Sequence, residues 1–346
     1  MSDASDRRGF FKQLLRGAAS TAQEVTQAFQ EAGGFDEPAV GGDPFGIQIG
    51  GGWEQRAVPA QRVTTTASED DLRRLADAHG LSTHVVELLE HARRSVRLTQ
   101  GGFGDRTRLG GAPDLPAGFE WPTWKEQDLD FVGQLDLAEL AALDVETGLP
   151  QSGLLLVFAA VDARPSGLTP TDRGAVRFVH VDGELTSAPE RGTYPPLPLE
   201  LSVEVTLPSE SAGLPPELGF GPFELDAWQR IREGLADLQG VELEDRSVEW
   251  HALHRLGGHP DTTEENMHVD AQLAANGIDL NSGERWYHPR VAELEQSAND
   301  WRLLLQLSTD DALGIQLGYP LGRLYAWIRE DDLRAGRFDD VWSFIR

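Results

Sequence analysis

The sequence predicts an α+β protein in which a β-rich unit occurs twice, the two copies packing as pseudo-symmetric halves after an αα-hairpin. Three matches in the same order along the 346 residues predict this duplication. The string RLGGAP at 108–113 recurs as RLGGHP at 255–260, and the apolar strand at 129–136 recurs at 301–308. A Gly-x-Pro turn then leads into a strand after 148 and again after 318. Each copy would therefore add a Gly-Gly turn and buried strands to one core.

The N-terminal part has a different composition. We expect a basic amphipathic helix within 1–32, a Gly/Pro-rich linker over 33–60 and the α+β domain over 61–346. Within the domain we expect a helical hairpin over 68–98, repeat one over 99–206 and repeat two over 207–346.

The hairpin is predicted from a capping signal and apolar spacing. Ser68 precedes Asp71 at capping-box spacing, and the apolar stripe that follows ends near Gly80. The apolar positions from Val85 to Val96 keep helical spacing, so a second helix is expected over Ser82–Leu98.

Charge restricts the classes of partner. The chain has 57 acidic and 30 basic residues, a net charge of -27, and this field repels nucleic acid and anionic lipid. We expect no nucleic-acid partner, and an acidic face suits a basic protein. Lysine occurs only as Lys12 and Lys125, which either a GC-rich genome or adaptation to salt would explain.

The segment 7–18 is a local exception, because four cations flank an apolar helical face there. It would dock on its own protein, be frayed in solution, or contact a partner or a membrane surface. No run of apolar residues reaches the length of a transmembrane helix, so the expected location is the cytoplasm. Cysteine is absent, which excludes disulfides and thiolate chemistry.

The repeated turns supply candidate ligand-binding residues. Adjacent glycines can present N–H groups to an anion, with an arginine beside them, or can simply permit positive φ in a tight turn. A glutamine inside each apolar strand must hydrogen-bond either the other copy or a ligand. The candidates are Arg108, Gly110, Gly111, Gln134, Arg255, Gly257, Gly258 and Gln306.

A histidine-rich stretch supplies candidate metal ligands. The histidines are His251, His254, His259 and His268, with Asp261, Glu264 and Glu265 among them. Imidazole and carboxylate suit zinc or manganese, but this spacing does not impose convergence on one ion. A helix N-terminus enriched in acid explains the same residues, and we assign no cofactor.

Further motifs resemble the YwqG-like family, bacterial domains of unknown function. They are the Gly-Gly-x-Pro-x-x-Pro turn at 110–116, Trp121-Pro122, the Gln-Leu-Asp ending at 136, the Trp-x-Leu-Leu-x-Gln strand at 301–306 and the segment 323–338. The resemblance covers about 98–346 and implies an internally duplicated α+β fold without a settled activity. The chain has GYPLG at 318–322 where the family often has a Gly-Asp-x-Gly turn.

Two functions remain open. The chain carries no Gly-x-Ser-x-Gly elbow, P-loop, dinucleotide fingerprint or His-Glu-x-x-His motif. We therefore expect a non-catalytic protein-binding module. The alternative is a hydrolase or transferase with a His/Asp/Glu cleft, assisted by a metal at the histidine-rich stretch. Convergence of three or more of those side chains in one pocket would favour the enzyme.

Overall fold

The computed structural model describes residues 67–101, 106–143, 145–209, 218–238, 253–262, 266–318 and 322–346. All of them belong to one compact unit, Ala60–Arg346. The N-terminal helix predicted within 1–32 and the linker predicted over 33–60 lie outside the described residues.

The helices are α2 (Glu69–Ala78), α3 (Val85–His91), α4 (Leu137–Ala141), α5 (Pro222–Leu238), α6 (Met267–Ala275), α7 (Val291–Leu294) and α8 (Glu330–Arg334). Short 3₁₀ helices are η1 (Ser82–His84), η2 (Pro170–Asp172), η3 (Pro189–Arg191), η6 (Glu284–Trp286) and η7 (Glu295–Asp300). The strands are β1 (Arg93–Gln100), β2 (Arg108–Leu109), β3 (Asp114–Leu115), β4 (Thr123–Trp124), β5 (Gln127–Asp128), β6 (Asp130–Asp136), β7 (Leu154–Ala159), β8 (Val176–Val181), β9 (Thr186–Ser187), β10 (Leu197–Thr206), β11 (His254–Gly257), β12 (Trp301–Ser308), β13 (Arg323–Arg329) and β14 (Trp342–Ile345).

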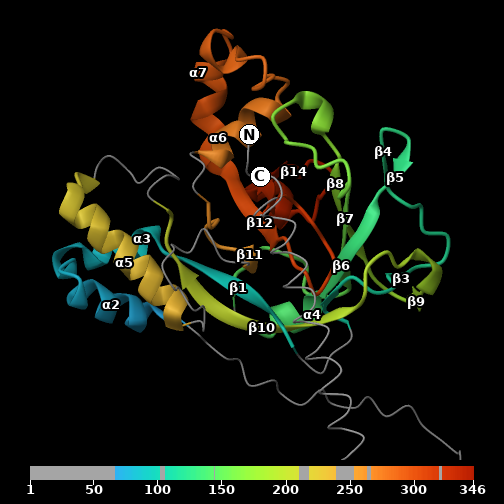
Figure 1. Ribbon diagram of the computed structural model, residues 1–346, viewed down its shortest axis with the longest axis horizontal. Helices are drawn as coiled ribbons and strands as arrows, with labels where there is room; N and C mark the ends of the chain where they lie inside the picture. Colours follow the sequence, from blue (N-terminus) through green and yellow to red (C-terminus); the bar gives the residue numbers. More distant parts are fainter. Residues whose placement is uncertain are drawn as a thin grey trace, which may run out of the picture. The chain divides into compact units, whose positions relative to one another are not determined.

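Ten of these strands form one antiparallel sheet in the order β14-β13-β12-β11-β1-β10-β2-β6-β7-β8 (Figure 1). The sheet curls until its two edges meet. Arg177 on β8 donates to the carbonyl oxygen of Asp339, just before β14, at 3.2 Å. Trp342 on β14 donates its indole N–H to Gly167 O at 2.9 Å. The expected α+β class is confirmed, as a nearly closed barrel with helices outside it.

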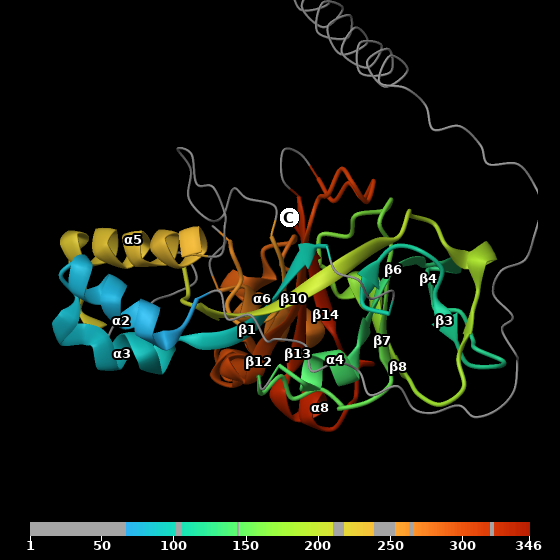
Figure 2. The same ribbon diagram turned by 90° about the horizontal axis from the view of Figure 1, so that it is seen from below.

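The apolar core lies mainly inside this curled sheet. It combines side chains from both ends of the strand order, such as Val157 on β7 and Ala326 on β13, with Val96 and Leu98 of the central strand β1. A second cluster joins α2, α3 and α5 to the end of β10 (Figure 2). A third packs α6 on the outer face of β12, β13 and β14. Burial of apolar surface in these layers is the main stabilising term.

The predicted hairpin is partly correct. Ser68 caps α2 and forms the expected capping box with Asp71. The second helix, expected to reach Leu98, ends at His91, and β1 follows at once. Ala92 has ψ 142, and the following residues pair with β10 and β11 on either side. Val96 fits the helical spacing of the apolar residues before it and also the strand spacing to Leu98. Burial in the centre of the sheet favours the strand.

Candidate functional site

The second Gly-Gly turn encloses a buried network of charges. Arg255 on β11 donates from Nε to the carboxylate of Glu204 on β10. Its Nη1 donates to Asp261 Oδ2 at 2.7 Å and to His259 O at 2.9 Å. Gln306 on β12 accepts from Asp261 N at 2.8 Å and donates Nε2 to Asp261 Oδ2 and Leu253 O, both at 3.1 Å. Gln306 and Glu204 are fully buried. Each group therefore supports another inside the protein.

The first Gly-Gly turn makes the same contacts with its own residues. Arg108 donates to Ala112 O, four residues on, and to Asp114 Oδ2 at 3.4 Å. Gln134 accepts from Asp114 N at 3.0 Å and donates to Asp114 Oδ2 at 2.8 Å and Arg106 O at 3.0 Å. The glutamines were expected to hydrogen-bond the other copy or a ligand, but their partners lie in their own copy. Each one is satisfied by the aspartate and backbone of its own turn.

Electrostatics favour the charged state of this network. Burial alone would raise the pKa of Asp261, but Arg255 and Arg323 lower it below its usual value. Burial likewise opposes ionisation of Arg255, while Asp261 and Glu204 raise its pKa. Arg255 is 2% exposed, so its hydrogen bonds are made within the chain. Gly110, Gly111, Gly257 and Gly258 all have positive φ, as the tight-turn interpretation expects.

The structure separates the histidines proposed as metal ligands. His254 accepts from Ser308 N at 3.2 Å through Nδ1 and lies 3.1 Å from Asp310 Oδ2 through Nε2, in a different part of the core from the others. His259 and His268 line one cleft. His251 lies outside the described residues, as do Glu264 and Glu265. Among the residues that the structure describes, no group of three His, Asp or Glu side chains could hold a metal.

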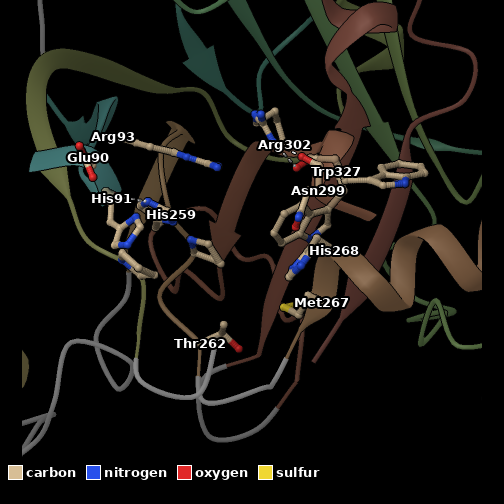
Figure 3. Close-up of a pocket in the computed structure, with 13 residues that line it drawn as sticks. Glu90, His91, Arg93, His259, Thr262, Met267, His268, Asn299, Arg302 and Trp327 are labelled. Atoms are coloured by element: carbon tan, nitrogen blue, oxygen red, sulfur yellow. Dashed lines mark hydrogen bonds between the residues drawn. The ribbon is translucent and has the colours of Figure 1, made fainter. Parts of the chain in front are cut away.

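The cleft that contains His259 and His268 has a volume of about 400 Å³. We call it the Arg93 cleft, and its charged and polar lining includes Arg93, His259, His268, Asn299 and Arg302. Figure 3 shows Arg93 and His259 on one side, His268, Asn299 and Arg302 on the other, and the Arg93 side chain extending into the gap. A second cavity, of about 610 Å³, shares Arg93 and Arg302 and includes the Gly257-Gly258 turn.

Positive charge and burial set the protonation of this cleft. Burial and the nearby Arg302 lower the pKa of Arg93 to about 10, so it stays a cation at neutral pH. Burial, then Arg93, lowers the pKa of His259 well below its usual value, and its Nε2 lies 2.7 Å from His91 O. Burial, Arg93 and Arg302 also lower the pKa of His268. Both imidazoles are neutral at pH 7, so they offer hydrogen bonds without adding charge.

Sequence reasoning missed Arg93 and Arg302. Arg93 fell within the helix expected over Ser82–Leu98, whereas it begins a central strand. Arg302 stands beside Trp301 at the start of β12, and only the fold brings it opposite Arg93. The one available signal was the change from helical to alternating spacing after Ala92.

In the part of the chain that the structure describes, none of the helices has the length and apolar character needed to cross a membrane. Comparison with known families finds one model, described as "Domain of unknown function (DUF1963)", which matches residues 107–345. No curated protein matches the chain.

Proposed function

The chain belongs to the DUF1963 family, whose description assigns no activity, and from its site we propose that it is a non-catalytic binding module with its ligand in the Arg93 cleft. The observation that carries this proposal is the cleft itself. Its volume of about 400 Å³ lies within the usual range for small-molecule sites. Apolar side chains such as Met267 form part of its wall, and a few polar groups converge on it.

The hydrogen bonding of the two imidazoles favours binding over catalysis. An activated nucleophile needs a hydroxyl or carboxylate in contact with a base. The ring of His259 contacts the backbone carbonyl of His91, and His268 packs beside the ring of Trp327, with centroids 6.4 Å apart. Among the described residues, no Ser, Thr or carboxylate side chain hydrogen-bonds to either ring. The described residues therefore do not support the convergence of catalytic side chains that would favour the hydrolase or transferase.

A variant that fills the cleft tests the proposal. Asn299 is exposed at the cleft wall, so Asn299→Trp adds a large side chain there without removing core packing. Asn281→Trp is the matched control, because Asn281 is also exposed and lines neither cavity. A library of small molecules would be screened against all three proteins by thermal shift, followed by mass spectrometry of each bound compound after incubation.

Compounds that raise the Tm of the wild type and of Asn281→Trp, but not of Asn299→Trp, would support the proposal. Binding that Asn299→Trp leaves unchanged would contradict it, because the ligand would then lie elsewhere. Conversion of a bound compound to a product would contradict the non-catalytic part and support the enzyme.

We also infer that the sheet arose by duplication, as β1, β2, β6, β7 and β8 followed by β10, β11, β12, β13 and β14. The strand order supports this. The first strands of the two copies, β1 and β10, pair at the centre of the sheet, and each later strand of one copy lies as far from its edge as the corresponding strand of the other copy. Each central strand pairs with the turn strand of the other copy, β1 with β11 and β10 with β2. The matching contacts of Gln134 and Gln306 support it further. The copies would then begin at β1 and β10, earlier than the expected 99 and 207.

Membership of the YwqG-like family, a cytoplasmic location and a basic protein partner stay predictions, as does peripheral contact through 7–18. Deletion of 7–18 with unchanged membrane and partner fractionation would remove the last of these.

A further inference from the structure

A gap in the sheet places Arg93 and Arg302 together. Strand β11 pairs with β1 only from Ser95 onward and with β12 only at Arg255 and Leu256. The start of β1 and the start of β12 therefore have no described strand between them. The two cavities meet the guanidinium groups at this gap, since Arg93 and Arg302 line both.

Arg93 has no ionic partner among the described residues. Arg302 lies 2.6 Å from Glu330 Oε2, and Arg334 contacts the other oxygen of the same carboxylate. No described side chain forms an ion pair or hydrogen bond with the guanidinium of Arg93. The charge of Glu330 raises the pKa of Arg93 without direct contact, and the charge of Arg302 lowers it. Arg93 thus places a half-buried positive charge without a described direct partner in a cleft that Glu90 also lines, and a bound anion would offset that charge.

The two Gly-Gly turns differ at this point. A side-chain carbon on Gly110 would lie 2.1 Å from Pro195 O, so the segment around Pro195 covers the first turn. A side-chain carbon on Gly257 would meet no described residue within 4 Å. The N–H of Gly258 has no acceptor among the described residues, whereas that of Gly111 is bonded to Tyr194 O at 2.9 Å. The second turn is therefore open to the larger cavity, and the first is closed.

From these contacts we infer that the Arg93 cleft takes a small organic oxyanion, with its charged group between Arg93 and the Gly257-Gly258 turn. This inference rests on the proposed binding function and adds the class of ligand. One guanidinium that has no ionic partner among the described residues, together with an open turn, suits a single carboxylate or phosphate group. Pro208, Pro260 and Met267 also line the cleft and suit an apolar remainder of the ligand. Because the first turn is covered, the described part of the chain offers one such site.

Calorimetric titration of the full chain tests the inference with phenyl phosphate, phenylacetate, inorganic phosphate and uncharged benzyl alcohol. The variants are Arg93→Gln, Arg93→Lys and, as the control for loss of one charge, Arg164→Gln. Arg164 is exposed and lines neither cavity. Circular dichroism first confirms that each variant is folded.

We expect at least one aromatic anion to bind the wild type with one site per chain. Arg93→Gln should weaken it by about tenfold or more, which corresponds to ~1.4 kcal/mol. Arg93→Lys should restore part of the affinity, and Arg164→Gln should leave it unchanged. The phenyl phosphate and phenylacetate arms show which oxyanion is preferred. Weaker binding of inorganic phosphate would show how much the apolar lining of the cleft contributes to affinity.

Anion binding that is equal in wild type and Arg93→Gln would overturn the inference. So would the absence of binding by every anion up to about 10 mM, well above the ~1 mM Kd that corresponds to about 4 kcal/mol. If benzyl alcohol alone binds and Asn299→Trp abolishes its binding, the binding function survives and the oxyanion class fails.

Discussion

Gln306 and Asp261 exchange two hydrogen bonds, from Asp261 N to Gln306 Oε1 at 2.8 Å and from Gln306 Nε2 to Asp261 Oδ2 at 3.1 Å. Gln134 and Asp114 exchange the equivalent pair at 3.0 and 2.8 Å. A side-chain amide thus ties each Gly-Gly turn to the neighbouring strand. The aspartate differs between the turns, because the Asp261 side chain is 6% exposed and that of Asp114 is 24% exposed.

This difference predicts unequal costs of removing the glutamine. Gln306→Leu leaves a buried carboxylate and N–H of Asp261 short of a partner, which costs about 3 kcal/mol of unfolding free energy. Gln134→Leu should cost about 1 to 2 kcal/mol, because water reaches Asp114. Urea unfolding measures both, with the exposed Gln151→Leu as the control. Equal losses at both positions would contradict the interpretation.

The two turns should also differ in their tolerance of alanine. Gly257 has φ 71 and open space around it, so Gly257→Ala should cost only the left-handed backbone strain, about 1 to 2 kcal/mol. Gly110→Ala adds a clash with Pro195 O and should cost at least about 2 kcal/mol more. Thermal unfolding of the two variants checks this order. A reversed order would mean that the second turn is not open.

His259 predicts a loss of stability in mild acid. Its pKa is lowered in the folded protein, so the unfolded chain binds the extra proton. The contribution is fully present above the unfolded pKa of about 6.5 and is lost as pH falls toward the folded value. Urea unfolding between about pH 4.5 and 7.5 should show a shallower slope for His259→Gln than for the wild type.

The matched control for replacing a histidine by glutamine is His180→Gln, at an exposed position. Asp261 also has a lowered pKa, but its contribution is lost only below the usual carboxylate range, outside this window. A slope that His259→Gln does not change would show that folding does not lower the pKa of His259.

Two arginines should respond in opposite ways to neutralisation. Arg255→Gln leaves Glu204 and Asp261 buried without their cation and should cost about 3 to 5 kcal/mol. Arg93→Gln removes a desolvated charge that has no ionic partner in the described part of the chain, so it should leave the unfolding free energy unchanged or raise it by up to about 1 kcal/mol. Urea denaturation of both variants and the wild type measures their unfolding free energies. The buffer should be low in anions, because an anion bound at Arg93 would stabilise the wild type. A large loss for Arg93→Gln would indicate that Arg93 is structural.

The strands and turns could be predicted from the sequence where local chemistry dictates them. The capping box at Ser68 and the positive φ of the paired glycines follow from residue type alone. The helix expected to reach Leu98 failed because Val96 and Leu98 fit two periodicities, and only pairing with β10 and β11 decides between them. Tertiary burial overrides local spacing at such positions.

The cleft could not be predicted in the same way. Arg93 and Arg302 are more than two hundred positions apart, and the early end of β11 brings them together. Of the eight ligand candidates named from the sequence, Gly257 and Gly258 line a cavity near Arg93. Arg108, Arg255, Gln134 and Gln306 bond instead to their own turns.

The most direct test of oxyanion binding is a crystal structure of the full chain soaked with selenate, which anomalous scattering locates. The account predicts one strong peak in the Arg93 cleft, with an oxygen about 2.7 to 3.2 Å from an Arg93 guanidinium nitrogen. Arg93→Gln crystals should lack that peak. Selenate ordered elsewhere on the protein with none beside Arg93, or the same peak in Arg93→Gln, would contradict it.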